Sequence, residues 1–486
     1  MIQIILNRPE YEYDVYGLTT SFFPGEDVSV KKTTASEDEF IIDIEDTCVS
    51  FDIHACGVVG KKTYELGKTN CDAKSEAGIY LYEFLSEVTG KTLPWGNLTG
   101  IRPTKIIRNM LSEKAEATGK SYKNPSIIDE VRKELYDTRR LKGDKFDLGV
   151  DIATRELDIL SSLHKEDGYS VYIGIPFCPS TCLYCSFTSN PVFKYRKKMD
   201  EYLEALIKEI KWTAENMKNY HLDSVYIGGG TPTTLEPLEL DKLLGAIVQY
   251  LPINNIAEFT VEAGRADSIT REKLEVLKKY PVTRISVNPQ TMKDETLKFI
   301  GRNHTVEQVR QAYALAREVG FDNINMDIIL GLPGEKLTDV ENTVTEIAKM
   351  NPESLTVHSL AIKRASKLKL WMQKNNIDND IDFEKAMDIC IKAAESTNLK
   401  PYYLYRQKQM AGNLENIGFS KEGKYGIYNI LIMEEVQSIV ALGAGSVSKR
   451  VFADGRIERC DNIKDIDLYL SKIGEMLDRK SKLFVD

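Results

Sequence analysis

The sequence is organised around one stretch of twelve residues, Gly174-Ile-Pro-Phe-Cys178-Pro-Ser-Thr-Cys182-Leu-Tyr-Cys185. Its three cysteines are separated by three residues and then by two. The segment before them, 169–175, alternates and is β-branched, which predicts a strand. The three thiols therefore belong to a short loop that leaves a strand, where they can converge on one point without distorting a helix or a sheet.

Three converging thiolates favour an iron–sulfur cluster over zinc. Both metals suit thiolate ligands, but a structural zinc site almost always has four of them. No fourth ligand is nearby, because Ser186-Phe187-Thr188 follows the motif and the nearest preceding histidine is His164, which we interpret as structural. Three ligands leave one iron of a four-iron cluster open to a substrate or cofactor. A redox dithiol with a spare cysteine, or coincidence, is the alternative that the tight spacing disfavours.

A regular alternation of strands and helices begins at Tyr169. Strands are predicted at 169–175, 223–228, 258–262, 283–288, 323–330 and 353–360. Helices are predicted at 199–218, 238–250, 268–280, 305–319 and 337–350. Six apolar strands joined by five helices predict a parallel sheet, closed or nearly closed as a barrel.

Polar residues and glycines gather where these strands end, which is where barrel enzymes place their sites. Gly228-Gly229-Gly230 follows the second strand, and three glycines let a ligand approach the backbone closely. Glu262 ends the third strand, Gln290 follows the fourth, and Asp327 lies in the apolar fifth, where a charge needs a partner. His358 near the sixth strand's end is either a proton carrier or a structural histidine. Ordinary strand-end or capping roles are the alternative for each.

The motifs resemble those of known families. Cys-x3-Cys-x2-Cys with an aromatic residue before the third cysteine resembles the radical S-adenosylmethionine (SAM) signature. Tyr172-Ile-Gly-Ile-Pro-Phe-Cys178, Gly228-Gly-Gly-Thr-Pro-Thr233 and Gly331-Leu-Pro-Gly-Glu335 together resemble the oxygen-independent coproporphyrinogen III oxidase (coproporphyrinogen dehydrogenase) family. Trp95-Gly-Asn-Leu-Thr-Gly-Ile-Arg-Pro-Thr-Lys105 is most similar to its HemZ-type branch, and the resemblance covers residues 90 to 450.

The resemblance implies a fold, cofactors and site residues. The fold is α/β, a radical SAM partial (β/α)6 barrel with an N-terminal α/β plus helical extension and a C-terminal α+β module. The cofactors are a [4Fe-4S] cluster and one or two molecules of SAM. The implied metal ligands are Cys178, Cys182 and Cys185, and the implied catalytic residues are Tyr172, Gln290 and Arg302. The implied cofactor-binding residues are Tyr172, Tyr184, Gly229, Gly230, Thr231, Glu262, Gln290, Arg302, Asp327 and Ala361.

The resemblance also implies a reaction. An electron from the cluster cleaves SAM, the resulting adenosyl radical takes a β-hydrogen from a propionate of coproporphyrinogen III, and loss of an electron and CO2 leaves a vinyl group. Two such events give protoporphyrinogen IX. A flavodoxin- or ferredoxin-like protein is the expected electron donor. The anionic tetrapyrrole needs cations at the barrel mouth, for which the candidates are Lys363, Arg364, Arg406 and Arg102.

Two positions differ from the oxidase pattern and keep other functions open. Gly174 stands where the oxidase has a histidine, and Ser186-Phe187 stands where it has a glycine and a fourth cysteine. The alternatives are a haem chaperone, a radical methyltransferase that opens the haem ring, and an RNA-modifying enzyme. RNA would use the window 98–146, which holds twelve Lys or Arg against seven Asp or Glu, although such a bias is usually a solvated helix face.

Four domains are expected: 1–95, a small α/β domain; 96–165, a helical, basic linker region; 166–365, the barrel; and 366–486, a module covering the barrel mouth. The first has predicted strands at Ile2–Leu6, Val28–Lys32 and Glu39–Ile44 and a helix at Asp72–Val88. In the last, helices are predicted around Phe383–Ala393 and Met433–Ala441, and Asp454-Gly455 predicts a hairpin with a type I′ turn.

Composition sets the remaining expectations. The net charge of −9 predicts no general nucleic-acid-binding surface. No run approaches the roughly 18 apolar residues of a membrane span, and the N-terminus has no secretory pattern. Eight cysteines in 486 residues do not form a disulfide framework. Free thiols and an oxygen-sensitive cluster together predict a cytoplasmic protein with no membrane partner.

Overall fold

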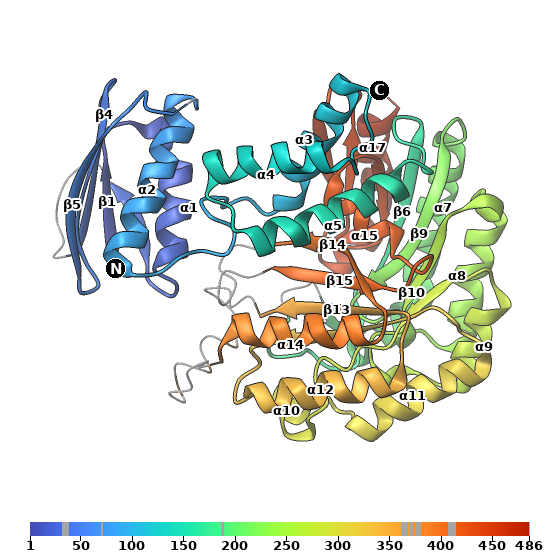
Figure 1. The fold of residues 1–486 in the computed structure, drawn as a ribbon. Coiled ribbons are helices and arrows are strands. Elements are labelled where there is room, and N and C mark those ends of the chain that lie inside the picture. Colours follow the sequence, from blue (N-terminus) through green and yellow to red (C-terminus); the bar gives the residue numbers. More distant parts are fainter. Residues whose placement is uncertain are drawn as a thin grey trace. The chain divides into compact units, whose positions relative to one another are not determined.

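The computed structural model describes residues 1–31, 38–69, 71–185, 189–360, 381–406 and 415–485, together with Leu368, Trp371 and Lys374 (Figure 1). Contacts divide the chain into two compact units. The first comprises Met1–Thr154 and Leu404–Glu415, and the second comprises Arg155–Tyr403 and Asn416–Asp486. The domain boundaries expected at 95, 165 and 365 stay predictions.

The first unit begins with a five-stranded sheet of order β2-β1-β3-β4-β5. Its strands are β1 (Ile2–Leu6), β2 (Val28–Lys31), β3 (Glu39–Ile44), β4 (Cys48–Ala55) and β5 (Val58–Glu65). The three predicted strands are thus confirmed, whereas β4 and β5 were not predicted. Helices α1 (Glu12–Phe22) and α2 (Ala73–Thr89) lie side by side on one face of the sheet (Figure 1). The buried aromatic rings of Phe40, Phe51 and Phe84 stack between sheet and helix.

Helices α3 (Pro103–Thr118), α4 (Pro125–Arg139) and α5 (Gly143–Leu160) follow. Several cations of this basic window are paired inside the first unit. Lys145 binds the fully buried Glu415 at 2.6 Å, and Trp95 donates its indole N–H to the same carboxylate at 2.7 Å. Lys114 pairs with Glu134 at 3.0 Å. Part of the basic bias therefore serves internal contacts.

The second unit contains an eleven-stranded sheet of order β14-β15-β13-β12-β11-β10-β9-β6-β16-β17-β18. Its six central strands are parallel and follow one another in chain order: β6 (Gly168–Ile175), β9 (His221–Gly229), β10 (Glu258–Glu262), β11 (Arg284–Ser286), β12 (Ile324–Leu330) and β13 (Ser354–Ser359). The connecting helices are α7 (Met199–Asn216), α8 (Pro237–Tyr250), α9 (Arg271–Lys279), α11 (Val306–Val319) and α12 (Leu337–Met350). All six strands and five helices confirm the predicted alternation.

Shorter elements lie in the loops of this unit. They are β7 (Phe177–Cys178), β8 (Asn190–Pro191), α6 (Val192–Tyr195), α10 (Asp294–Phe299) and the 3-10 turns Arg196–Lys198, Pro232–Thr234, Ile253–Asn255 and Ala266–Ser268, with a further such turn at Pro9–Tyr11 in the first unit. Of these elements, β7 carries the candidate ligand Cys178.

The C-terminal residues extend the sheet at both edges. Strands β14 (Lys400–Tyr405) and β15 (Asn416–Ser420) continue from β13, and β16 (Ser438–Leu442), β17 (Val447–Val451) and β18 (Ile457–Asp461) continue from β6. The helices are α14 (Phe383–Ser396), α15 (Ile427–Glu434), α16 (Ile466–Ser471) and α17 (Ile473–Phe484).

Two predictions for this region were wrong. The helix expected at Met433–Ala441 is not formed, because α15 ends at Glu434 and β16 begins at Ser438. The hairpin β17–β18 is confirmed. Its turn is not type I′, which needs positive φ at both central residues; Gly455 has φ 80° but Asp454 is not in the left-handed region.

A fully buried ion pair ties α7 to the C-terminal residues. Lys480 lies 2.7 Å from Glu209, and neither side chain is exposed. The Glu209 carboxylate also accepts hydrogen bonds from the Gly443 backbone N–H, the Asn462 amide and the Tyr469 hydroxyl. Because Gly443 directly follows β16, this network fixes the loop beside the C-terminal end of β6.

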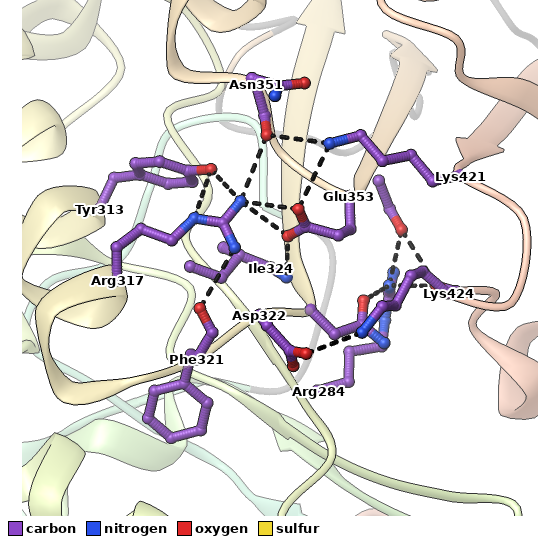
Figure 2. Close-up of polar contacts among 12 residues, drawn as sticks. Arg284, Tyr313, Arg317, Phe321, Asp322, Ile324, Asn351, Glu353, Lys421 and Lys424 are labelled. Atoms are coloured by element: carbon purple, nitrogen blue, oxygen red, sulfur yellow. Dashed lines mark hydrogen bonds and ion pairs between the residues drawn. The ribbon is translucent and has the colours of Figure 1, made fainter.

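A second polar network lies at the opposite, N-terminal ends of β12 and β13 (Figure 2). Arg317 and Lys421 both bind Glu353, at 2.8 Å and 3.4 Å, and Lys424 binds Asp322 at 3.0 Å. These contacts fasten the segment after β15 to the central strands. Since the charges are paired with one another, we assign the network a structural role.

None of the helices in the described part of the chain combines the length and apolar character that a membrane crossing requires. The expected cytoplasmic location stays a prediction.

Candidate functional site

The three cysteines lie in the loop that leaves β6. Cys178 is buried in β7, which pairs with β8. Cys182 and Cys185 form a turn in which the Cys185 N–H donates to the Cys182 carbonyl at 3.1 Å. The turn is held in place by Ser180, whose hydroxyl donates to the Gly301 carbonyl at 2.9 Å. The loop is therefore ordered in part by hydrogen bonds that do not involve the thiols.

The glycine loop after β9 packs directly against the first cysteine. Gly229 has φ 112°, a conformation that favours glycine. A Cβ at Gly230 would lie 2.6 Å from the Phe177 carbonyl oxygen and 2.9 Å from the Cys178 sulfur. The Thr231 hydroxyl donates to the same sulfur at 3.6 Å. Glycine is thus required at position 230, and the thiol of Cys178 already has a donor.

A buried arginine that the sequence analysis did not identify contacts the second cysteine. Arg265, from the loop after β10, is 3% exposed and lies 3.8 Å from the Cys182 sulfur through Nη1. The same atom donates to the Ser180 carbonyl and hydroxyl at 3.0 Å. Asp267 holds the other side of the guanidinium by two hydrogen bonds of 2.9 and 2.6 Å. A fixed positive charge therefore faces this thiol.

Arg302 brings a second buried guanidinium to the cysteine loop. It donates to the Asn288 carbonyl at 2.6 Å and to the Tyr184 hydroxyl at 3.3 Å. Its buried Nε has no hydrogen-bond partner among the described residues. Burial raises the pKa of Tyr184, which the positive charge of Arg302 opposes. The free Nε leaves a donor available to a ligand.

Two side chains after β11 carry buried oxygens that lack a hydrogen bond within the described chain, Asn288 Oδ1 and Gln290 Oε1. Gln290 also has φ 67°, which is uncommon for a residue other than glycine. Its backbone bridges to β12, because its N–H donates to the Asp327 carbonyl at 2.9 Å. Buried polar atoms normally have partners, so these two oxygens indicate a missing donor group.

Glu262 and the tyrosines around it form the next part of the site. The Tyr226 hydroxyl donates to Glu262 at 2.5 Å. Burial raises the pKa of Glu262 to about 7; the Tyr226 hydrogen bond opposes this shift and the charge of Asp327 adds to it. The rings of Tyr172 and Tyr428 both stack near that of Tyr226, and the closest pair, Tyr226 and Tyr428, have centroids 4.5 Å apart. Glu262 thus sits beside an aromatic wall.

Asp327 has the partners that its apolar strand requires. Asn325 donates to it at 2.6 Å, and His358 Nε2 lies 3.8 Å from its other oxygen. Burial acts to raise the pKa of Asp327, but His358 and these hydrogen bonds together lower it. His358 therefore serves at least as a partner of Asp327.

The comparisons with known proteins identify the family. A model of the radical SAM superfamily matches residues 172–347. The chain is 41% identical over 409 residues to the oxygen-independent coproporphyrinogen-III oxidase-like protein HemZ of Bacillus subtilis, covering 83% of this chain and 79% of that protein. This chain belongs to the HemZ family of radical SAM proteins.

The chain is also similar to a haem chaperone and to an oxidase of known structure. The haem chaperone HemW of Bacillus subtilis is 38% identical over 209 residues, which cover 43% of this chain and 54% of HemW. The chain thus matches about half the length of that relative. The structure of coproporphyrinogen III oxidase HemN from Escherichia coli, a radical SAM enzyme, matches with a TM-score of 0.52 at 20% identity, covering 67% of this chain and 73% of HemN. This match confirms the predicted fold class.

Membership of the radical SAM superfamily implies a [4Fe-4S] cluster and SAM. All eight cysteines are described and none forms a disulfide. No three His, Cys, Asp or Glu side chains in the described ranges converge tightly enough for a single metal ion. A four-iron cluster makes a different demand, because each thiolate binds a separate iron. The site fits such a cluster. Thr231 and Arg265 offer donors to two of the sulfurs, and Gly230 keeps a Cβ away from the Cys178 sulfur.

The structure places most of the predicted site residues within the parallel strands or in the segments that follow their C-terminal ends. They are Tyr172, Cys178, Cys182, Tyr184, Cys185, Gly229, Gly230, Thr231, Glu262, Gln290, Arg302 and Asp327. Their roles stay predictions. Ala361, Lys363 and Arg364 lie outside the described residues, as does Ser186-Phe187.

The other candidates lie elsewhere. Arg406 belongs to the first unit, where its side chain donates to the Leu98 carbonyl at 2.6 Å. Arg102 precedes α3 as its N-cap residue. His164 binds Asp223 at 2.8 Å, in agreement with the structural role expected for it.

Proposed function

We propose that this chain is a radical SAM oxidoreductase that oxidatively decarboxylates two propionates of coproporphyrinogen III, giving the vinyl groups of protoporphyrinogen IX. One observation carries the proposal: the cysteine loop packs against Gly230, Thr231 and Arg265, so that two of the thiols meet a donor and one keeps a glycine beside it. The names of the HemZ and HemN relatives support the substrate class.

In this proposal each part of the site has a task. Cys178, Cys182 and Cys185 would hold a [4Fe-4S] cluster, which would supply one electron for the cleavage of SAM. Gly229 and Gly230 leave the backbone accessible to the amino-acid end of SAM, and the Glu262 carboxylate accepts hydrogen bonds from its ribose. Arg302 Nε and Gln290 Oε1 offer a donor and an acceptor for the remaining polar groups. The tyrosine wall keeps water away from the reacting carbon.

The reaction balances in atoms and electrons. For each propionate, a β-hydrogen atom would move to the adenosyl carbon of the cleaved SAM. One electron then passes to an external one-electron acceptor, the bond to the carboxylate breaks, CO2 leaves and the carbon–carbon double bond forms. The electron for SAM cleavage comes from a flavodoxin- or ferredoxin-like donor.

A haem chaperone is the second candidate. Two observations favour it: the relationship to HemW, and Gly174 in place of the oxidase histidine. A chaperone would bind haem tightly and leave coproporphyrinogen III unchanged. We do not propose RNA modification, since part of the basic window is paired internally.

The test is an anaerobic assay in which the reconstituted protein is reduced with dithionite, freed of excess reductant and given SAM, coproporphyrinogen III and a one-electron acceptor, measuring 5′-deoxyadenosine, CO2 and vinyl products. We expect all three from the wild type and from Cys56→Ser, a control at an exposed cysteine. Cys182→Ser should lose the iron–sulfur absorbance and every product. Cleaved SAM without CO2 or vinyl product would refute the oxidase, and tight haem binding in the same sample would favour the chaperone.

A further inference from the structure

The first unit contains a cavity of about 340 Å³ between α1, α2 and the sheet. Its floor is apolar and is built from both helices and from β3 and β4: Val15, Leu18, Ile42, Ile44, Val49, Phe51, Ala77 and Leu81 line it. The two helices that border it lie side by side on the sheet (Figure 1). Its size falls within the range of about 300–1,000 Å³ that is typical of small-molecule sites.

The cavity is kept open by the sequence. Protein interiors are close-packed, and an apolar void of this size destabilises a fold. Gly78 lines the cavity from the middle of α2, where glycine is unfavourable. A Cβ at this position would meet its nearest neighbour, the Asn97 amide, at 3.7 Å, so a larger residue would fit and fill space. A glycine that weakens the helix and preserves the void indicates an occupant.

One end of the cavity is polar and has unused hydrogen-bonding capacity. Arg139, the last residue of α4, lines the cavity, and its guanidinium has no hydrogen bond or ion pair with the described residues. The buried Asn97 Oδ1 likewise accepts no hydrogen bond from the described chain. The two residues are adjacent, because the Asn97 N–H donates to the Arg139 carbonyl at 2.9 Å. Asp14 and Asp72 also line the cavity, and Asp14 is paired with Lys74 at 3.1 Å.

We infer that this cavity binds a small apolar amino acid or a molecule of the same chemistry. Its carboxylate pairs with Arg139, its N–H or O–H donor binds Asn97 Oδ1, and its apolar body fills the floor between α1 and α2. Lys74, which also lines the cavity, offsets the charge of Asp14, whereas Asp72 has no ion pair with the described residues and favours a cationic amino group over a second anion. The inference rests on the first unit alone and does not depend on the proposed radical SAM reaction.

The test uses the full-length protein and isothermal titration calorimetry. The probes are L-phenylalanine and L-leucine, and the matched controls are phenylethylamine without the carboxylate, 3-phenylpropionate without the amino group, and L-alanine without the large apolar body. We expect saturable binding of at least one of the two probes and at least about tenfold weaker binding of each control, since each lacks one of the three contacts.

Two variants locate the site. Arg139→Gln removes the carboxylate partner and should weaken binding by about tenfold or more. Arg132→Gln is the control, because Arg132 lies on the same helix but pairs with Asp147 and does not line the cavity. Gly78→Val fills the cavity and should abolish binding while circular dichroism shows an unchanged fold. Failure of both probes to bind at millimolar concentration, or binding that Arg139→Gln leaves unchanged, would overturn the inference.

Discussion

Replacing Lys480 by Met should destabilise the second unit more than most single substitutions. The change leaves the Glu209 carboxylate fully buried, with only uncharged donors from Gly443, Asn462 and Tyr469. Breaking a buried ion pair by removing one partner costs about 3–5 kcal/mol, because the remaining charge stays desolvated. The double variant Glu209→Gln/Lys480→Met removes that charge, so we expect it to recover at least about 1 kcal/mol relative to Lys480→Met alone.

The assay is urea unfolding of the metal-free protein, followed by circular dichroism at 222 nm, with hydrogen exchange of peptides from α17 as a local readout. Lys482→Met is the control, since this lysine lies on the same helix and is exposed. It should change the free energy of unfolding by less than about 0.5 kcal/mol. The reasoning is refuted if Lys480→Met behaves like Lys482→Met, or if the double variant is no more stable than Lys480→Met.

Three further predictions concern the site. Gly230→Ala should lower the iron and sulfide content per chain, because the added Cβ lies 2.9 Å from a cysteine sulfur, whereas Gly474→Ala, with nothing within 4 Å of the added atom, should not. SAM should bind more tightly as the pH rises through about 7, because Glu262 ionises there and becomes a better hydrogen-bond acceptor. Glu262→Gln should remove this pH dependence in equilibrium binding titrations. An equal pH dependence in the variant would contradict the assignment. Arg265→Gln should make the midpoint potential of the cluster more negative by tens of millivolts, relative to the wild type and to the control Arg271→Gln. A positive charge near 4 Å contributes about 4 kcal/mol at an effective dielectric of 20, which is well over 100 mV per electron. The effect is smaller than this because the paired Asp267 cancels much of the charge.

Periodicity predicted the centre of the second unit well, for a physical reason. Parallel strands covered by helices on their outer face are apolar over most of their length, and β6 and β12 are buried at nearly every residue. Each helix between them has a single apolar stripe, as α7 does with Tyr202, Leu203 and Leu206. Element type can therefore be read from such a pattern without knowledge of the tertiary structure.

The C-terminal strands could not be predicted in the same way. Ser438–Leu442 is a short apolar run that fits a strand and a helix segment equally well. It becomes strand β16 because the edge of β6 offers unpaired backbone groups, to which Val440 and its neighbours bond in parallel register. The deciding partner lies some 270 residues earlier in the chain, so the local sequence contains no signal for it.

The same distinction between local and long-range contacts decides which residues of the candidate site could be predicted from the sequence. The cysteines are recognisable because their spacing is local, and Gly230 because it belongs to a glycine triplet. Arg265 was missed because its contact with Cys182 joins two loops that are distant in sequence. The signal available was its position, three residues after Glu262 at a strand end, where a charged residue would deserve the same scrutiny as the carboxylate.

Gly174 shows why the departure from the oxidase pattern involves more than one residue. Its carbonyl accepts a hydrogen bond from Tyr202 at 2.8 Å, and a Cβ at Gly443 would lie 2.5 Å from that same carbonyl oxygen. A Cβ at Gly174 would meet the Leu442 carbonyl and the Tyr172 ring at 3.4 Å each, which is close van der Waals contact, so the last residue of β16 borders this position. The loop after β16 is in turn anchored by Glu209. Position 174 and the loop after β16 are therefore in direct contact, and the two features must be considered jointly when a substrate is assigned to this branch of the family.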